Sequence, residues 1–184
     1  EVVTASGDVV LASEKENGDL FWGLRGGGGN FGVVSSLEYR LHPVGPVTSG
    51  LAAHPVERAR DVLRFFREVT SSLPDELTLF GGLLHAPDGS GTRLAVLLAC
   101  HCGASGEAEA ALRPIKAFGT PAMDTLGSAS YEQTNMMLDE AFPRGALNYW
   151  KSSFLAELSD PAIEMLIVRF STCPSPMSGL VLEH

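Results

Sequence analysis

The order of hydrophobic and polar residues predicts that the chain begins with β structure. Apolar residues dominate 1–5 and 9–12, and the intervening Ser6-Gly7-Asp8 is a typical turn sequence. Hydrophobic and polar residues alternate again over 31–41. Because a period of two places one set of side chains on one face, we expect a hairpin over 1–12 and a strand over 31–41.

The longer second part of the chain mixes helical and strand-like spacing. Apolar residues recur every three or four positions over 55–71, which predicts a helix with one buried face. We also expect helices over 107–118, which Pro114 bends or ends early, and 161–169, and strands over 77–85, 93–102, 146–155 and 178–182. This order is typical of an α+β fold in which helices cover one face of an antiparallel sheet.

Pro43, Gly45 and Pro46 interrupt the pattern between these two parts. Proline and glycine are the strongest breakers of regular structure, so the domain boundary is expected within 43–47. We accordingly divide the chain into domains at 1–45 and 46–184.

Four consecutive glycines, Gly26 to Gly29, follow a short helix that we expect over 20–24, with Asp19 as its N-cap. Glycine has no Cβ and accepts positive φ, so such a run can turn sharply and bring bare backbone close to a ligand. A tight structural turn without a ligand is the alternative. A strand pattern follows the glycines where a dinucleotide-binding fingerprint needs a helix, and Asn30-Phe31 stands where a phosphate loop needs Lys followed by Ser or Thr.

Composition narrows the classes of partner. The 184 residues are 45% hydrophobic, enough for a substantial core, and carry a formal net charge of −9. Binding a phosphate backbone needs clustered Lys and Arg, whereas the 13 present are scattered, so no nucleic-acid partner is expected. No apolar run approaches the roughly 20 residues of a membrane span, so no membrane partner is expected. The three cysteines are an odd number, which does not support a disulfide framework and weakly favours the reducing cytoplasm. The localisation of the protein otherwise stays open.

Several motifs resemble the FAD-linked oxidases of the berberine bridge enzyme type, in the same order and spacing and over essentially the whole chain. The specific ones lie near the N-terminus: Gly7-Asp8-Val9-Val10, Asn17-Gly18-Asp19-Leu20-Phe21-Trp22, Arg25-Gly26-Gly27-Gly28-Gly29-Asn30-Phe31-Gly32-Val33-Val34 and Tyr39-Arg40-Leu41-His42-Pro43. Weaker ones follow in Tyr149-Trp150-Lys151-Ser152-Ser153-Phe154, Asp160-Pro161-Ala162-Ile163 and Pro174-Ser175-Pro176-Met177-Ser178.

The resemblance implies that domain 1–45 is the end of an FAD-binding domain and domain 46–184 an incomplete substrate domain. The implied FAD-contacting residues are Gly27, Gly28, Gly29, Asn30, Phe31, Gly32, Val33 and Val34. Arg25 either adds charge beside the diphosphate or caps the preceding helix. The family's flavin-attachment segment and its C-terminal flavin-contacting segment are not found here, so the resemblance implies an interior fragment without bound FAD. Leu182-Glu183-His184 is either native or a tag remnant.

The candidate catalytic residues are Tyr149 and Lys151, which alternation places on one face of the expected strand 146–155. In a pocket facing the flavin, either could take a proton from a substrate hydroxyl. The alternative is a packed strand with a lysine that extends its amine to solvent. Met136, Met137 and Phe142 either cover a hydrophobic substrate or pack in the core.

Cys100-His101-Cys102 has the composition of a metal site but not its geometry. On a strand the two cysteines face one side and His101 the other, so the three cannot converge on one ion without a bulge. We therefore expect no metal and interpret the cysteines as small buried hydrophobes.

Two hypotheses for function follow. In the first, the parent protein is an FAD-dependent oxidoreductase that transfers a hydride from an alcohol, amine or sugar carbon of a small-molecule substrate to flavin N5, and this chain, inactive alone, supplies cofactor wall and substrate pocket. In the second, the chain is a small-molecule binding or interaction module without redox activity. Truncation would expose apolar surface and favour self-association, so self-association would not separate the two.

Overall fold

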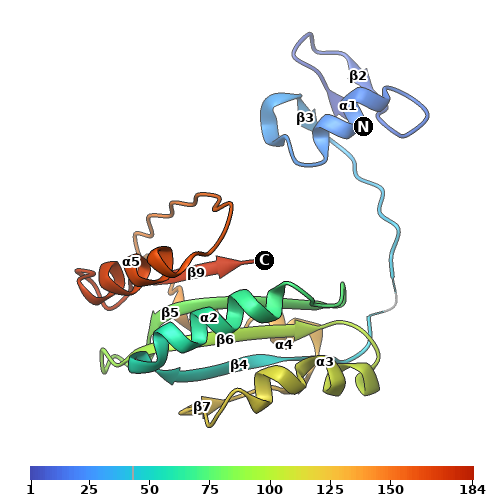
Figure 1. Ribbon diagram of the computed structural model, residues 1–184. Helices are drawn as coiled ribbons and strands as arrows, with labels where there is room; N and C mark the ends of the chain where they lie inside the picture. Colours follow the sequence, from blue (N-terminus) through green and yellow to red (C-terminus); the bar gives the residue numbers. More distant parts are fainter. Residues whose placement is uncertain (43) are drawn as a thin grey trace. The chain divides into compact units, whose positions relative to one another are not determined.

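The computed structural model divides into two compact units, Glu1–Pro43 and Val44–His184, which are described here one at a time (Figure 1). The structure describes residues 1–42 and 44–184, so Pro43, one of the predicted domain breakers, lies outside the described residues. The division falls two residues before the predicted boundary at 45/46. The assignment of the two parts to cofactor and substrate remains a prediction.

The smaller unit is built on a three-stranded antiparallel sheet. Strand β1 (Val2–Val3) lies between β2 (Val9–Val10) and β3 (Val33–Val34). Gly7 adopts a φ of 88° in the turn between β1 and β2, a value that favours glycine. The predicted hairpin is confirmed.

Two predictions in this unit are wrong in detail. Helix α1 (Gly18–Leu24) starts earlier than expected, with Asn17 in the left-handed conformation at its N-cap, and Asp19 lies inside its first turn, where its charge favours the helix dipole. The expected strand 31–41 is reduced to β3. Its pairing with β1 continues at Glu1, whose carbonyl accepts from the Ser35 amide at 3.0 Å and whose amino group donates to the Ser36 carbonyl at 2.9 Å.

The larger unit contains a six-stranded antiparallel sheet in the order β7-β4-β6-β5-β9, with β8 also paired to β4. Its strands are β4 (Val47–Pro55), β5 (Leu77–His85), β6 (Arg93–His101), β7 (Met123–Asp124), β8 (Gly127–Ala129) and β9 (Leu180–Glu183). The predicted strands 77–85, 93–102 and 178–182 are confirmed within two residues. Strand β4 pairs with β6 from Thr48 to Pro55, and β5 pairs with β6 along its full length.

Three helices pack on one face of this sheet. They are α2 (Ala59–Thr70), which follows the short 3-10 helix η2 (Val56–Arg58), α3 (Ser105–Ala117) and α5 (Asp160–Ser171). Their apolar residues meet those of the strands in one buried core of Ala52, Ala59, Val62, Leu63, Phe66, Leu77, Leu79, Leu83, Ala95, Leu97, Ala99, Leu112, Ile115, Ile163 and Phe170. The predicted α+β class with helices on one face is confirmed. Helix α3 continues three residues past Pro114 and does not end there.

The opposite face of the sheet carries a smaller apolar cluster. Ala53, Leu94 and Val96 are buried there, with Leu51 and Leu84 packed against them. Two short helices, α4 (Tyr131–Asn135) and η3 (Asp139–Ala141), lie in the connection between β8 and α5. The Thr134 hydroxyl of α4 lies 2.7 Å from the Ser49 hydroxyl of β4, which fixes α4 beside this second face.

Strand β4 and the neighbouring short strands are absent from the predicted elements. The sequence of β4 is rich in small residues, so it lacks the β-branched and aromatic signal of a typical strand. Gly50 explains part of that composition: its φ is 144°, and a Cβ there would lie only 2.7 Å from the amide nitrogen of Leu126, in the loop that joins β7 to β8.

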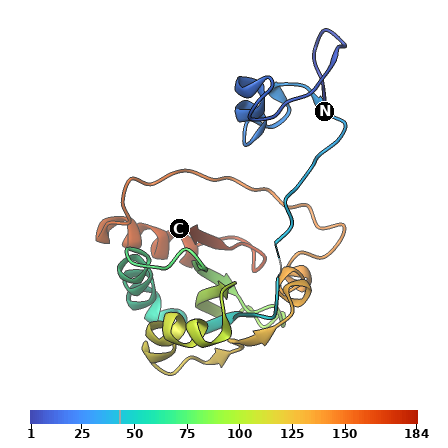
Figure 2. The ribbon, with the colours of Figure 1, turned by 90° about the vertical axis from the view of Figure 1, so that its right-hand side faces the viewer.

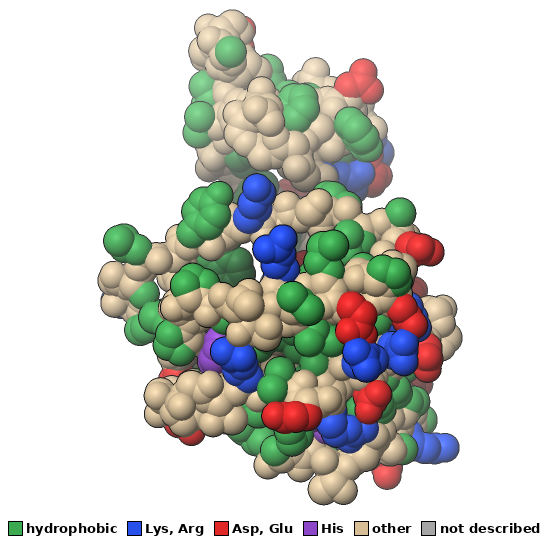
Figure 3. Space-filling model, turned by 60° about the vertical axis from the view of Figure 1, so that its left-hand side comes forward, with side chains coloured by type: hydrophobic (Ala, Val, Ile, Leu, Met, Phe, Trp, Pro, Cys, Tyr) green, Lys and Arg blue, Asp and Glu red, His purple; other side chains and the backbone are tan. Residues whose placement is uncertain are grey.

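The predicted strand 146–155 is wrong. This segment is an extended loop between η3 and α5, the long orange to red coil of Figure 2. The outer side of β4 is occupied by β7 and β8 and that of β5 by β9, and the segment pairs with neither of the edge strands β7 and β9. Side chains of the segment consequently stand in solvent, Leu147 and Phe154 completely so. The view in Figure 3 shows green hydrophobic side chains on the surface among the charged ones.

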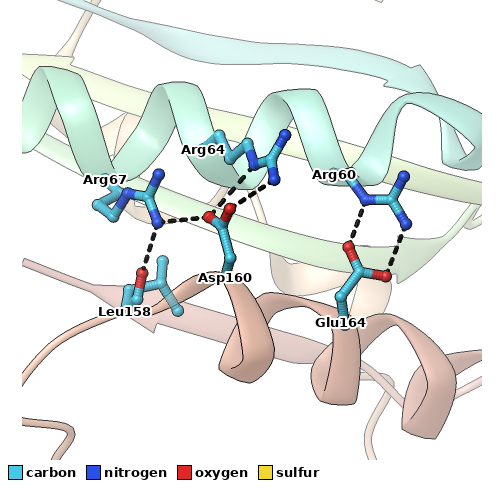
Figure 4. A network of polar contacts seen from close by, with 6 residues as sticks. All are labelled: Arg60, Arg64, Arg67, Leu158, Asp160 and Glu164. Carbon is cyan, nitrogen blue, oxygen red and sulfur yellow. Dashed lines mark hydrogen bonds and ion pairs between the residues drawn. The ribbon is translucent and has the colours of Figure 1, made fainter.

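An ion-pair network joins α5 to α2 (Figure 4). Asp160, the first residue of α5, accepts hydrogen bonds from Arg64 Nη2 at 2.5 Å and Arg67 Nη1 at 2.8 Å. Arg67 Nη1 also donates to the Leu158 carbonyl at 3.1 Å, and Arg60 donates twice to Glu164 one turn further along α5. Hydrogen bonds from Arg64, then from Arg67, lower the pKa of the Asp160 carboxyl.

We expect Asp160→Asn to lower the melting temperature of the sheet unit by a few degrees and to reduce its sensitivity to salt, because the pairs are solvent-exposed and screened. Since the folded-state pKa of Asp160 lies below its usual value, this stabilisation is present at neutral pH and is lost as the pH falls below about 4. Thermal melts by circular dichroism at low and high salt test this. Asp61→Asn, which removes only a 3.9 Å contact with Arg58, is the matched control and should change little.

A buried histidine introduces a second pH dependence. His54 is 1% exposed, and neither ring nitrogen has a hydrogen-bond partner among the described residues. Its ring meets the edge of Phe118 at 5.2 Å between centroids, and the Arg58 guanidinium lies 4.8 Å from the same Phe118 ring. Burial, and then the charge of Arg58, lower the pKa of His54, so the folded protein holds it neutral.

Because the unfolded chain binds a proton at His54 near pH 6.5 and the folded chain does so only at lower pH, stability should fall as the pH drops below about 6.5. We expect His54→Leu to flatten this decline while keeping the stability at pH 7.5 the same or higher, since it removes unpaired buried polar atoms. Chemical unfolding at pH 7.5 and 5.0 measures it. An equal decline in His54→Leu and in the exposed-site control His42→Gln would contradict the assignment.

Candidate functional site

The glycine loop of the smaller unit is held in one conformation by its own hydrogen bonds. Helix α1 ends at Leu24 with Arg25 as its C-cap, and a 3-10 turn, η1 (Gly28–Asn30), follows. The Asn30 side-chain amide donates to the Gly27 carbonyl at 2.8 Å, which closes the turn. Gly26 and Gly28 have φ values of 129° and 63°, so both need the conformational freedom of glycine.

Packing explains two further glycines. A Cβ on Gly27 would overlap the Phe31 ring and the Gly23 carbonyl oxygen, so Gly27 lets the ring of Phe31 lie across the end of α1. A Cβ on Gly32, whose φ is 138°, would lie 2.5 Å from the Val3 carbonyl oxygen of β1. Both glycines therefore serve the internal structure of the unit.

Gly29 is different. Its φ is not in the left-handed region, and a Cβ there would meet no atom of this chain within 4 Å. Neither backbone conformation nor internal packing in the described chain requires glycine at this position. Bare backbone facing open space is the feature that close approach of a planar or phosphate-bearing ligand requires.

Apolar side chains stand exposed beside this bare backbone. Phe31, Val33 and Val34 are all exposed, although two of them belong to the sheet. Arg25 is also exposed, and its guanidinium stacks over the Phe21 ring at 4.8 Å. Of the residues predicted to contact FAD, Gly27 and Gly32 are packed inside the unit, whereas Gly29, Phe31, Val33 and Val34 are open to solvent; their contact with FAD remains a prediction.

The predicted catalytic pair lies on the extended loop of the larger unit. Tyr149 is 89% exposed and Lys151 is exposed, and neither side chain forms a hydrogen bond to another described residue. Trp150, between them, lies 5.3 Å from the Phe142 ring. Met136 and Phe142 are exposed, so their interpretation as core residues is wrong. The roles of Tyr149 and Lys151 remain predictions.

The face of the sheet opposite α2, α3 and α5 is the second apolar surface of the larger unit. It presents half-buried Leu51, Phe80, Leu84 and Leu98 on adjacent strands. Ser49, from β4, contributes polarity through its contact with Thr134. Sequence reasoning missed Ser49, because β4 itself was not predicted.

The triplet at the end of β6 has the predicted alternation. His101 points to the helix-covered side, is buried, and accepts a hydrogen bond from the Gly103 amide at Nδ1. Cys100 and Cys102 lie on the other side, with their sulfur atoms 3.8 Å apart. Cys102 is exposed, so its interpretation as a buried hydrophobe is wrong. In the described part of the chain, no three His, Cys, Asp or Glu side chains converge as metal ligands.

Sequence comparison relates the chain to flavin enzymes. It is 34% identical over 142 residues to the FAD-linked oxidoreductase aurO of Gibberella zeae, covering 77% of this chain and 28% of that protein. It is 26% identical over 186 residues to an FAD-linked oxidoreductase of Dictyostelium discoideum, covering 100% of this chain and 40% of that protein. The chain thus spans less than half the length of these relatives. No protein-family profile matches it.

Solved structures share the fold. The structure of BBE-like #28 from Arabidopsis thaliana matches with a TM-score of 0.72 at 21% identity. The match covers 99% of this chain and 40% of the Arabidopsis chain. The carbohydrate oxidase from Microdochium nivale, solved with a substrate analogue, matches with a TM-score of 0.69 at 21% identity. This match covers 99% of this chain and 41% of the oxidase chain. At this identity the likeness concerns the fold alone.

The chain thus has an α+β fold shared with these solved structures, and its relatives in sequence are named FAD-linked oxidoreductases. Together they support the predicted resemblance to the FAD-linked oxidases of the berberine bridge enzyme type. Among the described residues, no helix is long and apolar enough to cross a membrane.

The different roles of the glycines can be tested in this chain. We expect Gly27→Ala and Gly32→Ala to destabilise the smaller unit by about 1–3 kcal/mol, because each adds a clash or a strained φ. Gly29→Ala should change its stability by less than about 1 kcal/mol. Amide hydrogen exchange of β1 and β3 measures all three. Equal loss of protection in Gly29→Ala would show that internal structure also requires this glycine.

Proposed function

We propose that the protein containing this chain is an FAD-dependent oxidoreductase that oxidises an alcohol, amine or sugar carbon of a small molecule. The observation that carries the proposal is Gly29, a glycine that the structure of the chain itself does not require, in a chain whose relatives are named FAD-linked oxidoreductases. The hydride-accepting chemistry at N5 belongs to the flavin when it is bound.

The residues of the smaller unit would bind and position the cofactor. Gly28 and Gly29 allow the backbone to approach it, because no Cβ holds the ligand away. Phe31, Val33 and Val34 would cover an apolar part of it and exclude water. Arg25 stacks on Phe21 at the end of α1, and its charge there is available to the diphosphate.

The residues of the larger unit would hold the substrate. The apolar face of the sheet opposite α2, α3 and α5 gives a surface for it through its half-buried leucines and Phe80. Tyr149 or Lys151 would accept the proton that leaves the substrate hydroxyl or amine as the hydride departs. For this the loop 146–155 must close over the substrate, which would also bury its exposed aromatic side chains.

The alternative is a binding or interaction module without redox activity. It is favoured by the fully exposed Leu147 and Phe154, since large exposed apolar side chains are typical of docking surfaces. The same exposure is expected of a chain that spans less than half the length of its relatives, so it does not discriminate between the two functions.

The test compares this 184-residue chain with the longest reading frame that contains it, both expressed with added FAD. We expect a flavin absorbance spectrum and the oxidation of an alcohol, amine or sugar, followed by dye reduction, only in the longer protein. In the longer protein, Gly29→Val should abolish flavin binding, whereas Gly45→Val, at another glycine with open space around it, should not. Flavin in neither protein would overturn the proposal in favour of the binding module.

The catalytic assignment needs a separate measurement on the flavin-loaded longer protein. Lys151→Ala or Tyr149→Phe should lower kcat by about 100-fold or more while the flavin spectrum is unchanged, since a general base typically contributes 10²–10⁴-fold. Lys116→Ala, an exposed lysine on α3, is the control. If both loop variants keep full kcat, the base lies elsewhere in the protein.

A further inference from the structure

The two cysteines at the end of β6 are positioned as a dithiol. Cys100 is opposite Ser49 of β4 and Thr78 of β5, on the side of the sheet away from α2, α3 and α5. Cys102 is one residue beyond the strand, and the period of two returns its side chain to the same side. The sulfur atoms lie 3.8 Å apart, in contact without a bond.

The environments of the two thiols differ in a way that sets an order of reaction. Cys102 is exposed and open to a dissolved oxidant, whereas Cys100 is half-buried. Burial, followed by the hydrogen bond and charge of Cys102, raises the pKa of Cys100 to about 11, so this thiol stays protonated and unreactive on its own. The exposed sulfur is therefore the one that an oxidant meets first.

The local backbone can accommodate a bond between the two sulfurs. Two residues of antiparallel strand span about 6.8 Å, the upper limit of the Cα separation in disulfides, so the chain must bend slightly as the sulfurs approach. Cys102 lies outside the strand ladder, held by one backbone hydrogen bond from its amide to the Glu76 carbonyl at 2.9 Å. Gly103 follows and gives the backbone freedom to bend.

We propose that Cys100 and Cys102 form a reversible redox pair that a hydroperoxide converts to an intrachain disulfide. The Cys102 thiolate attacks the peroxide oxygen, the O–O bond breaks, and an alcohol or water leaves with a proton while Cys102 becomes a sulfenic acid. The Cys100 sulfur then attacks the Cys102 sulfur, the S–O bond breaks, and the Cys100 proton leaves with the hydroxide as water. Two thiols and one hydroperoxide thus give one disulfide, one alcohol or water, and one water.

This proposal does not depend on the flavin. A metal centre is a weaker use of the pair, because His101 lies on the opposite side of the strand and no third ligand converges among the described residues. A bent end of β6 also has a structural consequence: the disulfide would pull Cys102 away from Glu76. The amide of Cys102 should then lose its protection from hydrogen exchange in the oxidised chain.

The test uses the 184-residue chain, fully reduced and then treated with a small excess of hydrogen peroxide. Alkylation with N-ethylmaleimide followed by intact mass should show three modified thiols before treatment and one after it. Dithiothreitol should restore three. Cys173→Ser is the matched control, because the Cys173 sulfur packs against the main core and donates to the Ser175 carbonyl at 3.7 Å, with no hydrogen bond to another cysteine; it should go from two modified thiols to none.

Cys102→Ser should keep two alkylable thiols after the same treatment, and its far-UV spectrum shows whether it is folded. In Cys100→Ser, dimedone should label the sulfenic acid at Cys102. Three thiols retained after peroxide, a disulfide to Cys173 or to a second chain, or dimedone labelling at Cys173 in place of Cys102 would each overturn the proposal.

Discussion

The long pairing of β6 with β4 on one side and β5 on the other is the interaction on which the larger unit depends. The strands are held in register from Thr48 to Pro55 and from Leu77 to His85. Because β6 is apolar on both faces, this register decides which residues meet the helices and which face the other way. A slip of one residue would exchange Leu97 and Ala99, in the main core, with Leu98 and Cys100.

That division gives the two faces different uses. The helix-covered face is closed by the main core and by the α2–α5 ion pairs, so it offers no room for a ligand. The other face retains half-buried apolar residues, the Ser49–Thr134 contact and the pair of cysteines. Because helices cover one face of the sheet, the polar contact and the two thiols lie on the other face.

The sequence predicted the elements whose signal is local, and missed those that depend on distant partners. Helix α2 and strands β5 and β6 have strong periodic patterns, and all three form where expected. Strand β4 has a weak pattern because Gly50 must pass close to the β7–β8 loop. The segment 146–155 has a strong pattern but pairs with no strand of the sheet, and its side chains stand in solvent. Local pattern thus specifies what a segment can form, and the available partners decide whether it does.

The glycine loop shows the same limit at the level of a site. Sequence alone treats Gly26 to Gly29 as one signal, although three of them serve the unit itself: two through positive φ and Gly27 through the packing of Phe31. A run of glycines is therefore weak evidence for a ligand until the glycines that backbone conformation or internal packing requires are set aside. Of these four, only Gly29 then remains, because neither its φ nor a nearby atom of the described chain requires glycine there, and a contact outside the loop is a cause that would explain it. A bound cofactor is such a cause, and it links the most local feature of the sequence to the chemistry of the family.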